Sequence, residues 1–178
     1  MLAWWNSSLG ADQITATEIR TGLWTLRFLA ITLAVTPVRQ LLGLGALARY
    51  RRMFGLFVFF YAVIHVLTWS WADTDFDLGF MGREIAKHRY ILVGMLTFVI
   101  LIPLAFTSTK GWIKRMGGRR WNRLHQLIYV AGVTGTVHYL WAVKKDTFFP
   151  LVYLVVFIAL LGYRAVRSAR MRAARLAA

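Results

Sequence analysis

The chain has 178 residues, of which 58% are hydrophobic and only 16% are charged, and its formal net charge at pH 7 is +15. This balance excludes an ordinary soluble domain. The chain contains no cysteine, which excludes covalent haem attachment through C-x-x-C-H, iron–sulfur clusters and dithiol redox chemistry.

Five apolar runs approach the length that is needed to cross a bilayer. They cover residues 21–38, 53–71, 90–106, 124–143 and 148–163. Only helices satisfy their own backbone groups inside a membrane, and these runs do not alternate as barrel strands do. We therefore predict an all-α integral membrane protein, with residues 1–178 forming a single domain built on a five-helix transmembrane bundle. Pro37 is expected to end the first helix.

The charged residues predict the orientation of this bundle. Three of the segments between or after the predicted helices fall on one side of the membrane, and they hold fifteen basic residues and no acid: Arg39, Arg49, Arg51, Arg52, Lys110, Lys114, Arg115, Arg119, Arg120, Arg123, Arg164, Arg167, Arg170, Arg172 and Arg175. All seven acids fall on the other side. The positive-inside rule then places the basic loops and the C-terminus in the cytoplasm and the N-terminus in the periplasm of a bacterial inner membrane.

Orientation and contact with anionic headgroups of the lipid bilayer account for most of the basic residues. A nucleic-acid partner is not expected, because no recognition module remains once the spans are removed. A functional alternative is that some arginines of the basic loops, such as Arg52 and Arg120, pair with a flavin phosphate or with haem propionates.

Histidines inside or at the edge of the apolar runs are candidates for function, since imidazole is costly to place in hydrocarbon. His65 lies eight residues before Asp73 and His138 lies six before Lys144, which places them about 12 Å and 9 Å below the outer polar boundary. Two imidazoles at similar depth on parallel helices predict the two axial ligands of one haem. His125 lies about 20 Å deeper and is a candidate for an inner cofactor or a second haem. For each histidine alone, a hydrogen-bonded position in the core is the alternative.

Two further features of the spans allow a cofactor. The small residues before His138, including Gly132 and Gly135, would let a flat macrocycle approach the backbone, although ordinary helix packing explains them equally well. Arg27 lies inside the first helix. It is expected to extend to the outer interface or, alternatively, to pair with a haem propionate.

Several stretches of the chain carry a family resemblance: TG-x4-RF with TPVR at 21–39, YRRMFGLFVFFYAVIHVLTW at 50–69, LAFTSTK at 104–110, RRWNRLHQLIYV at 119–130 and HYLW at 138–141. On these residues the chain resembles the haem-binding membrane subunits of periplasmic methionine-sulfoxide reductase systems, within the ferric-reductase-like transmembrane superfamily. The resemblance implies a b-type haem, held by His65, His125 and His138, and an FMN. It also implies that electrons pass from the quinone pool or a cytoplasmic flavin reductase to a molybdopterin-containing periplasmic subunit that repairs oxidised methionines.

The sequence departs from this family in one respect and from the wider superfamily in another. Family members begin with one more transmembrane helix, and MLAWWN resembles the tail of such a helix, so a sixth, N-terminal helix is expected to be missing or truncated here. No nicotinamide- and FAD-binding domain follows the last run, so we expect an electron-transfer subunit of an oxidoreductase complex without a complete catalytic site of its own. The rival hypotheses are a small proton-coupled transporter, which would be colourless, and a membrane scaffold with structural histidines.

Overall fold

The computed structural model describes residues 10–143 and 147–176, and this part of the chain is helical with no strand. In chain order the helices are α1 (Gly10–Leu42), the 3-10 helix η1 (Gly45–Arg49), α2 (Arg51–Ala72), α3 (Leu78–Lys87), α4 (Arg89–Phe106), α5 (Lys110–Met116), α6 (Gly118–His125), α7 (Leu127–Ala142) and α8 (Phe148–Leu176). The all-α membrane fold that the composition predicts is confirmed.

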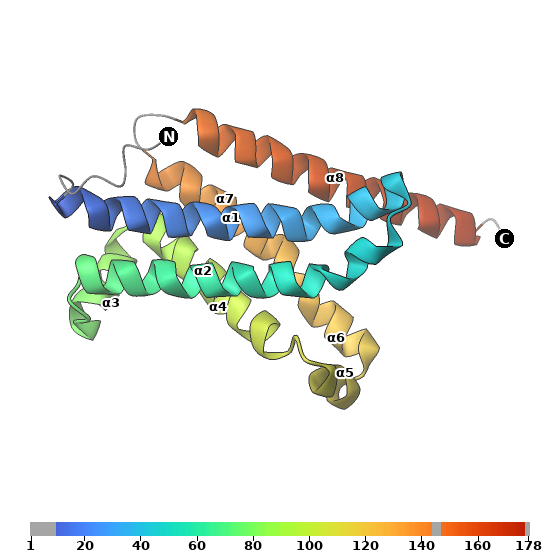
Figure 1. The fold of residues 1–178 in the computed structure, drawn as a ribbon, viewed down its shortest axis with the longest axis horizontal. Coiled ribbons are helices and arrows are strands. Elements are labelled where there is room, and N and C mark those ends of the chain that lie inside the picture. The colour runs from blue at the N-terminus through green and yellow to red at the C-terminus, as the bar shows by residue number, and fades with distance from the viewer. Residues whose placement is uncertain (1–9, 144–146, 177–178) are drawn as a thin grey trace.

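Four segments of the described chain are long and apolar enough to cross a membrane. They are Gln13–Leu42, Gly45–Ala72, Arg89–Phe106 and Phe148–Ala174. The 16 residues of α7 make the fifth long element of the bundle, and α7 contacts α4, α8 and α1. Figure 1 shows α1 and α2 side by side, with α8 running along the opposite flank of α1.

The bundle has two ends of opposite charge. At the acidic end α1 and α4 begin while α2 and α7 finish, and it holds Glu18, Asp73 and Glu84. At the basic end α1 finishes and α2 begins, beside the second half of α8, and it holds Arg39, Arg51 and Arg164. In Figure 1 the acidic end is at the left and the basic end at the right.

Buried aliphatic side chains fill the bundle between these ends. Leu26, Leu29 and Leu33 lie on one face of α1, at helical spacing, and are 6%, 1% and 0% exposed. They pack in one cluster with Val58 and Ala62 of α2, Leu101 and Leu104 of α4, Ile128 and Ala131 of α7, and Phe157 of α8. The core therefore ties all five long helices together.

The prediction that Pro37 ends the first helix is wrong, because α1 continues to Leu42 with Pro37 inside it. Proline has no N–H to donate to the carbonyl four residues earlier, which here belongs to Leu33. That carbonyl instead accepts a hydrogen bond of 2.7 Å from Arg164 Nη2 of α8. A partner from another helix thus satisfies the acceptor that the proline leaves free, and the helix does not need to stop.

The other predicted helix bounds differ from the structure mainly at charged ends. α1 begins at Gly10 and α8 runs to Leu176, well beyond the predicted 21–38 and 148–163. The last part of α8 is rich in alanine and arginine, which favour helix even where the chain is polar. The predicted helix 124–143 is interrupted at Gln126, whose N–H is shared between the carbonyls of Asn122 and Arg123, each at 3.2 Å. The second and third runs match α2 and α4 within two residues.

Candidate functional site

A cavity of about 610 Å³ opens at the acidic end, between α1, α2, α4 and α7. Its volume lies in the range of small-molecule and cofactor sites. Apolar side chains such as Leu26, Phe98 and Leu101 form most of its wall, and His65 and His138 are its two histidines. Glu18 and Asp73 also line it. We call it the histidine cavity.

The rings of His65 and His138 meet inside this cavity. Their centroids are 6.2 Å apart and their planes cross at 74°. With a metal–nitrogen bond of about 2 Å on each side and roughly 1.1 Å from each bonding nitrogen to its ring centroid, an iron bound by two imidazoles needs centroids about 6 Å apart. The spacing of the two rings therefore fits the axial ligands of one haem.

The hydrogen bonds of the two rings leave the nitrogen needed for ligation available. His65 Nδ1 lies 2.9 Å from the Glu18 carbonyl oxygen, and His138 Nδ1 lies 2.6 Å from the Tyr90 carbonyl oxygen. A carbonyl only accepts, so each Nδ1 carries the proton and each neutral ring has its lone pair on Nε2. A hydrogen bond from Nδ1 to a backbone carbonyl is the one that metal-binding histidines use to fix their tautomer and orientation.

Two glycines make room for these rings. A Cβ added at Gly94 of α4 would lie 2.6 Å from His138 Nδ1, and one added at Gly22 of α1 would lie 3.1 Å from His65 Cε1. The first distance is far below van der Waals contact. Each imidazole thus packs directly on the backbone of the helix that supplies its carbonyl partner, α1 for His65 and α4 for His138.

His125 lies elsewhere, at the end of α6, and is not among the residues that line the histidine cavity. Its Nε2 is 3.0 Å from Thr107 Oγ1, and that hydroxyl donates its own proton to the Pro103 carbonyl. His125 Nε2 must therefore be the donor to Thr107. The ring also stacks on Trp121, with centroids 3.9 Å apart. These contacts describe the hydrogen-bonded alternative for His125, and its ligand role stays a prediction.

The three arginines predicted to meet an anionic cofactor lie outside the histidine cavity. Arg27 is exposed on α1, with its guanidinium 4.7 Å from the centroid of the Trp24 ring. Arg52, at the start of α2, and Arg120, in α6, are also exposed. The structure does not bring these side chains together with His65 or His138, and their pairing with a cofactor is untested.

Sequence reasoning missed the groups that hold the histidines. Gly22, Gly94 and the carbonyls of Glu18 and Tyr90 carry no side-chain signal for such a role. The two small residues of α7 have different roles. Gly135 lines the cavity, as the cofactor hypothesis predicts, whereas a Cβ at Gly132 would lie 3.1 Å from Phe157 of α8, as the helix-packing hypothesis predicts. Within the described residues, no group of three or more His, Asp or Glu side chains is placed to hold a bare metal ion.

Comparison with known proteins defines the class first. Residues 21–136 match the family described as ferric reductase like transmembrane component, so the fold and the paired histidines stand in a ferric-reductase-like membrane protein. No solved structure is significantly similar to the chain.

Curated relatives then narrow the family. The chain is 46% identical over 172 residues to the protein-methionine-sulfoxide reductase heme-binding subunit MsrQ of Xanthomonas campestris, covering 96% of this chain and 78% of the relative. Proteins of the same name from Polaromonas naphthalenivorans and Azospira oryzae are 47% and 43% identical, over 90% and 94% of this chain and 74% and 72% of theirs. The chain therefore belongs to the MsrQ family of haem-binding subunits.

Proposed function

We propose that this chain carries one b-type haem between His65 and His138 and passes its electrons to a methionine-sulfoxide reductase subunit at the acidic end of the bundle. The observation that carries the proposal is the pair of rings in one cavity, 6.2 Å apart, each tied through Nδ1 to a backbone carbonyl. Membership of a family of haem-binding subunits supports it independently.

The residues of the cavity have distinct tasks in this proposal. The carbonyls of Glu18 and Tyr90 hold both imidazoles in the tautomer that offers Nε2. Leu26, Phe98 and Leu101 provide an apolar wall that limits the access of water and so influences the redox potential. The bound haem would supply a one-electron couple between ferrous and ferric iron.

The direction of electron flow follows from the charged ends. With the basic end in the cytoplasm, the histidine cavity opens near the periplasmic face. A periplasmic, molybdopterin-containing catalytic subunit would accept electrons there for the repair of oxidised methionines. The quinone pool or a cytoplasmic flavin reductase would donate them from the membrane or the basic end, with FMN as a second cofactor. These partners rest on the family resemblance, and the relatives are named as haem-binding subunits of protein-methionine-sulfoxide reductases.

The test is a reduced-minus-oxidised visible spectrum of the detergent-purified chain, with haem quantified per protein. We expect a b-type spectrum and about one haem per chain, since one histidine pair provides both axial ligands of one iron. Separate His65→Ala and His138→Ala variants should lose the haem.

His88→Ala is the matched control, because His88 pairs with Glu84 at 3.1 Å outside the cavity lining. It should keep the haem of the unsubstituted chain. A colourless protein produced with adequate haem supply, or full haem content in either cavity variant, would overturn the assignment.

A further inference from the structure

Four arginines gather where α1, α2 and α8 meet at the basic end. Arg51 lies close enough to Arg164 and to Arg39 for each of them to disfavour its positive charge. Arg167, one turn after Arg164, donates a hydrogen bond to Gln40, which follows Arg39 in the chain. We call Arg39, Arg51, Arg164 and Arg167 the arginine cluster.

Within the described residues, the protein offers this cluster hydrogen bonds but no acidic side chain. Arg164 donates to the Tyr129 hydroxyl at 2.6 Å and to the Leu33 carbonyl at 2.7 Å, and both acceptors are neutral. Its Nε atom is buried and has no hydrogen-bond partner among the described residues. The sequence contains no acid between Glu18 and Asp73, between Glu84 and Asp146, or after Asp146. Grouped cations without a carboxylate are costly unless an external anion joins them.

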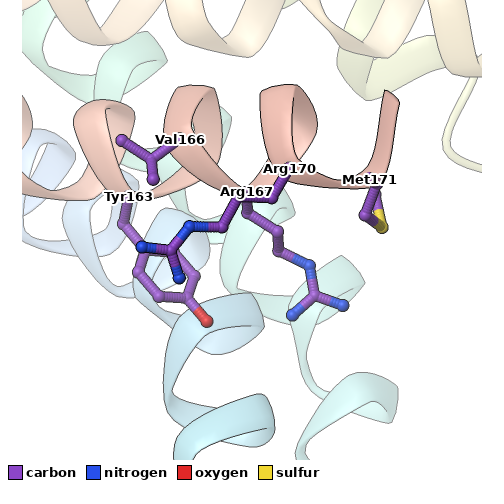
Figure 2. A pocket seen from close by; sticks show the side chains of 5 residues that line it. All are labelled: Tyr163, Val166, Arg167, Arg170 and Met171. Carbon is purple, nitrogen blue, oxygen red and sulfur yellow. The ribbon is translucent and has the colours of Figure 1, made fainter. Parts of the chain in front are cut away.

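The surface beside the cluster is amphipathic. Tyr163, Val166, Arg167, Arg170 and Met171 of α8 line a groove of about 600 Å³, and Figure 2 shows the tyrosine and the two arginines projecting from one side of the helix. Leu41 and Leu42, at the end of α1, are 71% and 65% exposed. Guanidinium groups next to exposed apolar side chains suit a ligand with an anionic head and a hydrocarbon tail.

We propose that the arginine cluster binds the phosphate of an anionic phospholipid, with the acyl chains along the apolar surface of α1 and α8. Guanidinium forks match phosphate oxygens in pairs, which a single ammonium does not do. Basic pockets between transmembrane helices at the cytoplasmic side take such headgroups. The bound lipid would offset part of the positive charge of the cluster and join α8 to α1 and α2. This site is separate from the histidine cavity and does not depend on the proposed haem.

The experiment is thermal unfolding of the purified chain in neutral detergent, titrated with phosphatidylglycerol or phosphatidylcholine. We expect phosphatidylglycerol to raise Tm with saturation and phosphatidylcholine to have a much smaller effect. Arg51→Gln should raise the half-saturating concentration by about tenfold, as expected for the loss of one charge-assisted hydrogen bond. Arg172→Gln, an exposed arginine of α8 outside the groove, should change it by less than about twofold.

Arg167→Gln is a second variant in case Arg51→Gln does not fold. It should likewise weaken the response to phosphatidylglycerol. Inorganic phosphate is titrated in parallel, and equal stabilisation that disappears in the same variants would support a phosphate site filled from solution. Equal effects of the two lipids, or cluster variants that respond like the unsubstituted chain, would overturn the proposal.

Discussion

At the scale of single residues, the site depends on backbone carbonyls and on glycines as well as on its two histidine side chains. His65 and His138 attract attention in the sequence because histidine is rare in apolar runs. The backbone carbonyls of Glu18 and Tyr90 accept hydrogen bonds from the two rings and so orient them. Gly22 and Gly94 leave space for the rings because they have no side chain. No pattern of side chains identifies such partners, since every residue carries a carbonyl.

Gly94→Ala tests the backbone contact of His138. The added methyl would lie 2.6 Å from His138 Nδ1, so the ring must leave the Tyr90 carbonyl, and we expect haem per chain to fall. Gly162→Ala is the control, because a Cβ there meets nothing within 4 Å and alanine favours helix. Haem absorbance of the two purified variants, compared at equal protein, measures the effect. Unchanged haem in Gly94→Ala would show that this contact does not position the ligand.

His125→Ala tests whether a second iron is present. His125 already uses Nε2 to donate to Thr107 and stacks on Trp121, so we expect the variant to retain the haem between His65 and His138. Haem per chain, measured before and after substitution, gives the answer. A loss of half of the haem would instead assign His125 to a second haem, the alternative that its depth along the helix suggests.

At the scale of helices, the chain places small residues where neighbours approach closely. Gly132 of α7 faces Phe157 of α8, and a Cβ there would lie 3.1 Å from the ring. Phe157 is 2% exposed, so the ring has little room to move. The contact explains why α8 packs on α7 at this point, and it shows that Gly132 serves helix packing.

Gly132→Val should separate α7 from α8 and lower the stability by about 1–3 kcal/mol, as overpacked cores do. The measurement is Tm in detergent together with haem content. We expect Tm to fall while the spectrum keeps its shape, because Gly132 does not line the histidine cavity. The double variant Gly132→Val with Phe157→Leu should recover part of the loss, and no recovery would contradict the proposed contact.

At the scale of the whole molecule, the helices separate acidic and basic side chains to opposite ends of the bundle. The helices bring the acids of three segments to one end and the arginines of three others to the opposite end. The histidine cavity lies at the acidic end and the arginine cluster at the basic end. The haem that we propose for the cavity would therefore lie nearer to a partner at the acidic end than to one at the basic end.

The absence of native cysteine allows a direct test of orientation. Leu78→Cys, at an 82% exposed position of the acidic end, should react with a membrane-impermeant maleimide in intact spheroplasts. Ser168→Cys, at an exposed position of α8 at the basic end, should react only after permeabilisation. The opposite labelling pattern would reverse the proposed direction of electron flow.

The sequence by itself determined the class of protein, the apolar spans, the charge asymmetry and the two histidines of similar depth. These properties follow from the composition and from the constant rise per residue of a helix, so they need no knowledge of tertiary contacts. Depth along parallel helices already predicts that His65 and His138 are level, and their rings do meet.

Only the tertiary structure decided what those residues contact. It shows that α1 passes through Pro37 because Arg164 satisfies the freed carbonyl of Leu33, and that His125 is held by Thr107 away from the other histidines. It also brings Arg39, Arg51 and Arg164 together from three helices. Each of these facts depends on the rotation and separation of helices that are distant in sequence. Periodicity and charge patterns do not contain that information, because it arises only when side chains pack.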